Sequence, residues 1–117
     1  MAHKGYTLNY FINFFKNIPD HRWTTGTLQR EGTVQMCALG HCLTNQNVSD
    51  ATTVNLNDLG VQRNAKTEAL QEFLNGDVES INDDDNNTYG LGTTPRGRIL
   101  RALRNRKRTG SPYGNRT

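Results

Sequence analysis

Residues 93–110 read TTPRGRILRALRNRKRTG, and this stretch predicts the last helix of the chain. Thr94 can cap the helix with its side chain, and Pro95 suits the first helical position because no N–H donor is needed there. One face of the helix is apolar: Ile99, Leu100, Ala102 and Leu103. We therefore expect this face to pack on the hydrophobic core of the domain.

The same stretch is strongly basic. Within residues 96–108 there are seven cationic side chains: Arg96, Arg98, Arg101, Arg104, Arg106, Lys107 and Arg108. Six of the seven are arginines, whose planar guanidinium can bind a phosphate through two hydrogen bonds. We expect Arg101, Arg104 and Arg108 on the side opposite the apolar face. The pattern predicts a site for nucleic acid or another polyanion, and nothing in it specifies a base sequence.

Charge is distributed unevenly along the chain. Residues 1–95 carry six Lys/Arg and eleven Asp/Glu, a net −5, and residues 96–117 carry eight Lys/Arg and no acid, a net +8, which together give the overall +3. Such asymmetry suggests an anionic partner for the basic end. The structural alternative is that the basic helix pairs with the acidic body, in particular with Asp83, Asp84 and Asp85, and serves stability alone.

Three further helices are predicted, in residues 7–18, 37–45 and 64–76. The first has an apolar stripe at helical spacing: Leu8, Phe11, Ile12 and Phe15. Thr7 can cap this helix, and Pro19 follows its end. Asn64 can cap the third of these helices, and Gly76 can end it. Gly40 lies inside the second helix, where it is unfavourable, and therefore suggests close approach by another backbone.

A β-hairpin is predicted between the first two helices. Residues 23–30 and 33–36 are rich in Thr and contain spaced apolar residues, and Gly32 lies between them. A short helical turn is expected at residues 54–59. The predicted fold class is α+β, mainly helical, with about four helices and one β-hairpin. Residues 1–108 are expected to form a single compact domain, followed by a flexible basic tail at 109–117.

Both cysteines lie in the segment CALGHCL, residues 37–43, with His41 between them. Cys37 and His41 share a helix face and could supply two zinc ligands, but structural zinc needs four and no second pair is present. Cys37 near a helix start could also be a nucleophile assisted by His41, although such pairs normally come from different segments. The favoured interpretation is that Cys37 and Cys42 are small buried apolar groups, and that His41 has a local hydrogen-bond partner.

Several classes of protein are disfavoured by the composition. Only 33% of the residues are hydrophobic. No stretch approaches the roughly 18 consecutive apolar residues that a membrane span needs. The N-terminus lacks the apolar region of a secretory signal, and the two cysteines are badly placed for a disulfide with each other. Residues 83–85 lack the alternation of a calcium loop, and no glycine-rich phosphate loop is present. We expect a cytoplasmic protein with no cofactor, no metal and no membrane partner.

A resemblance is carried by three segments in order. They are RWTTGTLQREG at 22–32, CALGHCL at 37–43, and INDDDN at 81–86 followed by the capped last helix; they contain the patterns W-x-x-G, C-A-L-G and N-D. Their order and spacing resemble an uncharacterised domain family of bacteriophage and actinobacterial genomes, over most of residues 8–105. The resemblance implies a small phage-type accessory protein that works in the cytoplasm of the host cell.

The resemblance also implies structural roles for the shared residues. Trp23 would anchor the core, and Gly26 and Gly40 would be positions of close backbone approach. Asn82 and Asp83 would bond backbone groups that lead toward the last helix.

Our hypothesis from the sequence is a non-enzymatic protein that binds nucleic acid through its last helix. The alternative is a host-directed protein, either an inhibitor of a bacterial defence protein or a binder of a small anionic signal molecule. A Cys37-dependent hydrolase is a much weaker third hypothesis.

Overall fold

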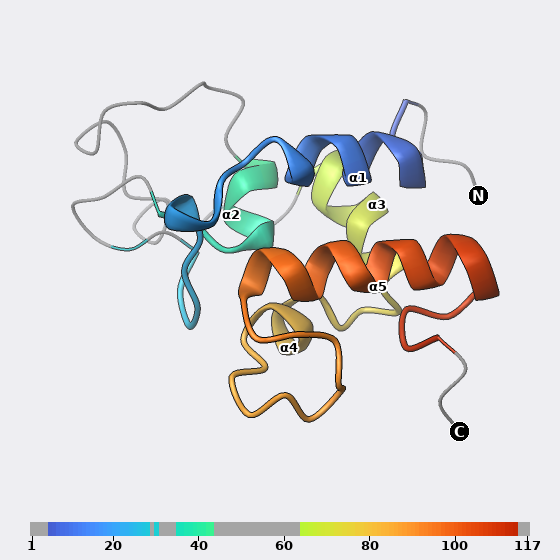
Figure 1. The fold of residues 1–117 in the computed structure, drawn as a ribbon. Coiled ribbons are helices and arrows are strands. Elements are labelled where there is room, and N and C mark those ends of the chain that lie inside the picture. Colours follow the sequence, from blue (N-terminus) through green and yellow to red (C-terminus); the bar gives the residue numbers. More distant parts are fainter. Residues whose placement is uncertain (1–4, 29, 31–34, 44–63, 115–117) are drawn as a thin grey trace.

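The computed structural model describes residues 5–28, 30, 35–43 and 64–114. Helix α5 (Pro95–Thr109) is the longest helix described, and α1 (Leu8–Lys16) packs along it. The two helices run in opposite directions, as Figure 1 shows. Contacts at both ends fix this register, because Lys107 bonds the side chain of Asn9 while Arg96 bonds the carbonyl of Lys16.

Both helices begin where the sequence predicts, while α1 ends at Lys16, two residues before the predicted end. The Thr7 hydroxyl accepts the N–H of Tyr10, and the Thr94 hydroxyl accepts the N–H of Gly97. Gly110 closes α5 in the left-handed conformation that glycine adopts without strain. The predicted first and last helices, and the caps that define them, are therefore confirmed.

Three shorter helices complete the described part of the fold. They are α2 (Ala38–Leu43), α3 (Ala65–Phe73) and α4 (Val78–Asn82), and a single turn, η1 (Asp20–Arg22), precedes α2 in the chain. Asn64 caps α3 reciprocally with Thr67, so the predicted start of that helix is confirmed. Helix α4 was not expected from the sequence.

The core lies where the helices meet. Phe11 and Phe15 of α1 are fully buried, as are Ile99 and Leu103 of α5. Aromatic contacts extend the core, since the ring of Phe11 lies 6.1 Å from that of Phe73, the last residue of α3. No helix among the described residues is both long and apolar enough to cross a membrane.

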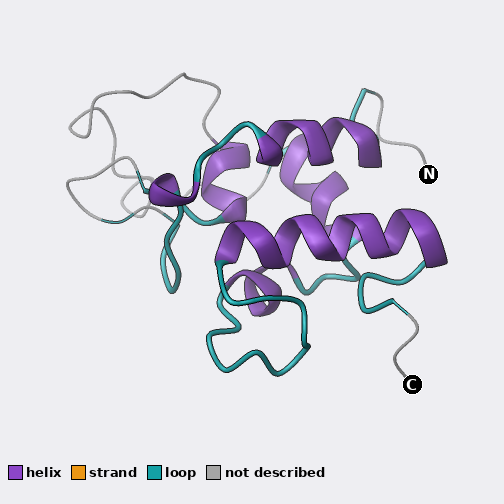
Figure 2. Ribbon diagram, in the orientation of Figure 1, coloured by secondary structure: helices purple, strands orange, loops and turns teal. Residues whose placement is uncertain are grey.

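The predicted β-hairpin, and with it the α+β class, is wrong. No β-strand occurs in the described ranges, which are mainly helical (Figure 2). Trp23 and Met36 form one isolated bridge, and it is parallel rather than antiparallel. The carbonyl of Leu28 accepts the N–H of Cys37 at the start of α2, so this segment packs on a helix instead of a partner strand. The helical turn expected at 54–59 lies outside the described residues.

Gly40 is a position of close approach, as the sequence suggested. A Cβ atom there would lie 2.1 Å from the carbonyl oxygen of Leu28, so only glycine fits. Gly26 has a different role, because nothing lies within 4 Å of its Cβ position and its φ is +78°. The close approach expected at Gly26 is therefore wrong. Trp23 is buried, and its indole N–H donates to the carbonyl of Ile18, which confirms it as a core residue.

The chain stays packed on the body beyond the end of α5. Pro112 is buried, its carbonyl accepts the side-chain amide of Asn105 at 3.1 Å, and the Tyr113 hydroxyl donates to the Asp77 carboxylate. Within the predicted tail, residues 109–114 thus belong to the packed structure, and residues 115–117 lie outside the described part of the chain.

Candidate nucleic-acid interface

Helix α5 distributes its seven basic side chains over different environments. Arg98 is fully buried, and its guanidinium donates to the carbonyls of Ile81 at 2.9 Å and Asn82 at 2.6 Å. It also lies 3.4 Å from the Asp85 carboxylate, whose side chain is 71% exposed. Arg98 therefore links α5 to the end of α4 and cannot reach a phosphate in solution. Its inclusion among the anion-binding residues is corrected on this ground.

Arg106 is also turned toward the body. It is half-buried, and the centre of its guanidinium lies 5.7 Å from the ring centroid of Phe73, in the range of a cation–π contact. This arginine packs over Phe73 at the end of α3, so we do not count it with the outward-facing cations.

The remaining five side chains lie along the outer part of α5, from the α1 side (Arg96, Lys107) to the side remote from α1 (Arg101, Arg108), and we call this surface the basic face: Arg96, Arg101, Arg104, Lys107 and Arg108. All of them are exposed except Arg96, which is half-buried. Arg101 and Arg104 make no hydrogen bond or ion pair with any other described residue. The other three bond neutral groups, the Lys16 carbonyl and the side chains of Asn9 and Asn105.

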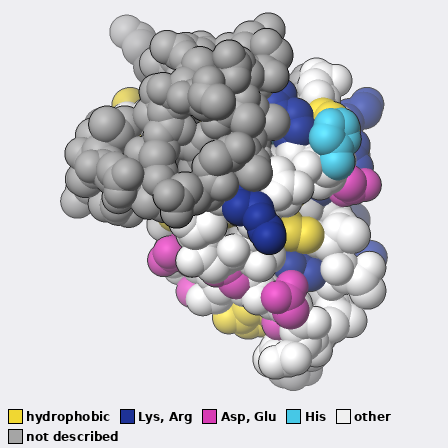
Figure 3. Space-filling model, turned by 90° about the vertical axis from the view of Figure 1, so that its left-hand side faces the viewer, with side chains coloured by type: hydrophobic (Ala, Val, Ile, Leu, Met, Phe, Trp, Pro, Cys, Tyr) yellow, Lys and Arg dark blue, Asp and Glu magenta, His cyan; other side chains and the backbone are white. Residues whose placement is uncertain are grey.

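The surroundings of the basic face favour an anionic partner. Neither α1 nor α5 contains an acidic residue, and Lys16 adds an exposed cation at the end of α1. On the end of the molecule shown in Figure 3, by contrast, Asp and Glu side chains lie among the basic ones. Among the described residues, the pairing with Asp83–Asp85 that would make the helix purely structural is found for Arg98 alone.

The acidic loop after α4 does not form a converging carboxylate cluster. The Asp84 side chain is buried and accepts the backbone N–H groups of Thr88 and Tyr89, at 2.8 and 2.9 Å. Burial raises the pKa of Asp84, but these hydrogen bonds outweigh burial, so the pKa is lowered. Asp83 accepts the amide of Asn82 instead. The carboxylates thus order the loop, and within the described ranges no group of three or more candidate ligands is placed to hold a metal ion.

The cysteines are packed rather than exposed. Cys37 and Cys42 are free and buried, as expected. Burial raises the pKa of Cys37 to about 11 and that of Cys42 to about 12, so both are neutral thiols near pH 7. A neutral thiol is a poor nucleophile, and this weakens the hydrolase hypothesis.

His41 is likewise a buried structural residue. Its Nε2 lies 3.0 Å from the Arg22 carbonyl, and its ring lies 5.1 Å from that of Trp23. Burial lowers the pKa of His41 to about 4, so the ring is neutral near pH 7 and Nε2 donates to the carbonyl. The ring therefore packs against the segment around Trp23. The expected hydrogen bond is present, but its partner is 19 residues away in the chain and not local.

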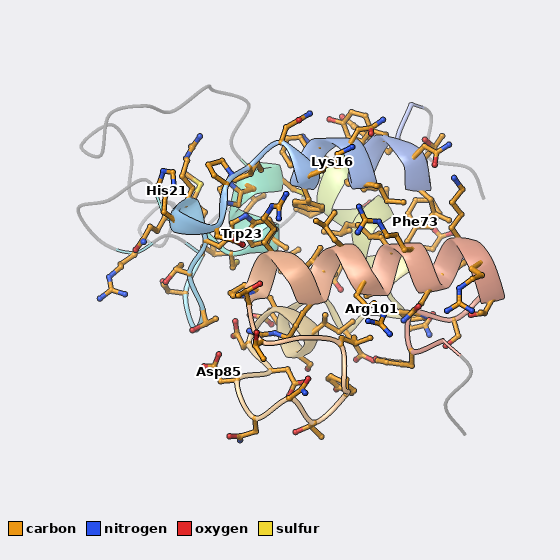
Figure 4. All side chains as sticks on the ribbon, viewed as in Figure 1. Lys16, His21, Trp23, Phe73, Asp85 and Arg101 are labelled. Carbon is orange, nitrogen blue, oxygen red and sulfur yellow. The ribbon has the colours of Figure 1, made fainter. Side chains whose placement is uncertain are left out.

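A small pocket borders the basic face. It has a volume of about 260 Å³, and its lining combines residues of α5, of the loop before it and of the turn after it: Tyr89, Gly90, Leu91, Arg101, Asn105, Arg108, Tyr113 and Gly114. Figure 4 shows Arg101 on the side of α5 remote from α1. Two members of the basic face, Arg101 and Arg108, thus reach this pocket.

Comparison of the chain with protein-family models, with characterised proteins and with solved structures found no match. The resemblance to a phage and actinobacterial domain family therefore stays a prediction. The candidate site rests on the geometry of α5 and of the residues around it.

Sequence reasoning did not find the aromatic part of this site. Tyr89 and Tyr113 come from different segments, yet their ring centroids are 5.0 Å apart. A weak signal was present, since each tyrosine is followed by glycine in the pairs Tyr89–Gly90 and Tyr113–Gly114. Periodicity could not reveal them, because neither lies in a helix.

Proposed function

We propose that this protein is a non-enzymatic, phage-type accessory protein that binds nucleic acid through the basic face of α5. The observation that carries the proposal is the array of five cations on the outer surface of α5, none of them paired with a described carboxylate, beside a second helix without acidic residues. The core-facing side of α5 holds the helix in place, so the array is presented on a fixed scaffold.

The chemistry of the array suits a phosphate backbone. Arg101 and Arg104 have all their guanidinium donors free of other described residues, and each can bind a phosphate through two hydrogen bonds. Arg96, Lys107 and Arg108 donate to neutral acceptors, so their positive charge is not compensated by a described carboxylate. Phosphate contacts provide affinity with little dependence on sequence.

Salt dependence gives the proposal a quantitative test. Each phosphate neutralised contributes about 0.7–0.9 to the slope of log K against log salt concentration. Replacing Arg101, Arg104 and Arg108 by Gln preserves helix propensity and should reduce this slope by roughly 2 to 3. The measurement is a titration of wild type and triple variant against labelled single-stranded and duplex oligonucleotides at two or more salt concentrations.

The control removes the same charge from elsewhere in the chain. A triple variant with Lys4, Arg30 and Arg63 replaced by Gln has the same net charge, but it leaves α5 intact. It should retain the slope of the wild type. Absence of wild-type binding at about 50 mM salt, where non-specific basic proteins bind, would end the proposal.

A further inference from the structure

The pocket beside the basic face has one aromatic wall. Tyr89 and Tyr113 stack with an interplanar angle of 28°, and both are half-buried. The Tyr113 hydroxyl donates to the Asp77 carboxylate, and burial together with this bond raises its pKa. The hydroxyl therefore stays protonated and holds the ring. The tyrosine pair is thus an aromatic surface that a hydrogen bond to the body orients.

The lining of the pocket is also cationic. Arg101 and Arg108 both line it, and they are seven residues apart on α5, about 10 Å along the helix axis. Gly90 and Gly114 also line the pocket, and neither has a side chain to fill it. The lining of the pocket thus combines aromatic rings with guanidinium groups.

The size of the pocket limits what can enter. Sites for whole small molecules usually measure about 300–1,000 Å³. The volume here is about 260 Å³, which suits a single planar group better than a dinucleotide or a larger signal molecule. A nucleobase is such a group, and stacking on an aromatic side chain is the common way in which proteins hold an unpaired base.

We propose that this pocket receives one unpaired base of a single-stranded nucleic acid, stacked on the Tyr89–Tyr113 pair, with the flanking phosphates on Arg101 and Arg108. The inference rests on the proposed function and adds a preference for single strands over duplex. In a duplex the base faces are covered by their neighbours, so only the phosphate contacts of the basic face remain available. Unpaired DNA and RNA share this chemistry.

The first test needs no variant. Binding of wild-type protein is compared, by fluorescence anisotropy at one salt concentration, between a labelled single strand, a matched duplex and a single strand with abasic sites. Single-stranded DNA and single-stranded RNA are measured separately to distinguish the two sources. The base contact predicts that the abasic strand binds about 5- to 150-fold more weakly than the intact strand, the range given by stacking of one base.

The second test removes the aromatic ring and keeps every charge. Tyr89→Leu should weaken binding of the intact single strand by the same factor and leave duplex affinity and the salt slope unchanged. Tyr89→Trp retains an aromatic face and should retain the single-strand preference. Thermal unfolding of both variants checks that the fold is preserved.

The outcomes separate the two proposals. Binding of intact and abasic strands with equal affinity by wild type would overturn the base pocket, while salt-dependent duplex binding would still support the basic face. Equal affinity of Tyr89→Leu and wild type for the intact single strand would also overturn it. Failure of wild type to bind any oligonucleotide would overturn both.

Discussion

Asn82 accepts the backbone N–H of Ala38 through its side-chain oxygen, at 3.0 Å. Ala38 is the first residue of α2, so this bond satisfies an N–H group that the helix itself cannot pair. The side-chain amide of Asn82 donates to the Thr24 carbonyl at 3.0 Å, and the Asn82 carbonyl accepts from Arg98. One buried residue therefore joins α2, the segment after η1 and α5.

We expect Asn82→Ala to destabilise the protein strongly. The N–H of Ala38 and the carbonyl of Thr24 would lose their partner in a buried environment, at about 1–3 kcal/mol for each unsatisfied group. The free energy of unfolding in urea should fall by about 2 kcal/mol or more. Asn86→Ala, at an exposed position in the nearby loop, is the matched control and should change it little. Equal losses in the two variants would contradict this role.

The same substitution should affect stability at Arg98 and nucleic-acid binding at Arg101. Arg98→Met removes a donor from the carbonyls of Ile81 and Asn82. Ile81 keeps the N–H of Asp84 and the Asn82 carbonyl is left unpaired, so we expect a loss of about 1–3 kcal/mol in unfolding free energy. Arg101→Met should leave stability nearly unchanged and weaken oligonucleotide binding. Asp85→Asn should cost at most about 1 kcal/mol, because an exposed partner contributes little. Denaturant unfolding and anisotropy on the same samples distinguish the two roles.

Gly40→Ala tests the contact between α2 and the Leu28 carbonyl. The added Cβ would lie 2.1 Å from that oxygen, which also accepts the N–H of Cys37, so the backbone must move. We expect a loss of about 3 kcal/mol or more. Gly26→Ala meets no atom but forces alanine into a left-handed conformation, at about 1–2 kcal/mol. A smaller effect at Gly40 than at Gly26 would show that the contact is absent.

The thiols should be unreactive in the folded protein. Burial raises the pKa of Cys37 to about 11, so labelling by a thiol reagent at pH 7 should be slow until denaturant exposes both cysteines. Cys37→Ser and Cys42→Ala should each lower stability by about 1–2 kcal/mol and leave nucleic-acid binding intact. Rapid native-state labelling of Cys37, or stoichiometric zinc in the purified protein, would refute the packed arrangement.

Stability should fall on acidification because of His41. Its pKa is lowered by burial from 6.5 to about 4, so between these values the unfolded chain binds a proton that the folded chain does not. The stabilising contribution is complete above about pH 6.5 and is lost toward pH 4, by at most about 1.4 kcal/mol per pH unit. His41→Gln should remove this part of the slope when unfolding is measured at pH 7, 6 and 5. An unchanged slope would count against a buried neutral ring.

Residues with a local physical role were the most predictable. Thr7, Asn64 and Thr94 start helices through bonds to backbone groups three residues away, which is information that a short window of sequence contains. The hairpin prediction was wrong because threonines and spaced apolar residues indicate only that a segment is half-buried. Here the segment packs on α2 and not on a second strand. Helix α4 has five residues, which is too short for periodicity to show.

The candidate site was predictable in outline but not in membership. Arg98 is four residues from Ala102 on the buried side of α5, so helical spacing already indicated that it would point inward. The many basic residues around Arg98 concealed its inward position. The pocket could not be predicted, because Tyr89 and Tyr113 are brought together by long-range packing alone.

The antiparallel pairing of α1 and α5 also sets the order of events during synthesis. The partner of α1 comes from residues 95–109, about eighty residues after α1 itself. At ribosomal rates of about 5–20 residues per second, α1 waits roughly 4–16 s before α5 is made. Phe11 and Phe15, fully buried in the finished fold, lack their α5 surface during that interval. The nascent chain therefore presents an aromatic segment to chaperones, and the final docking step must close a loop of about eighty residues.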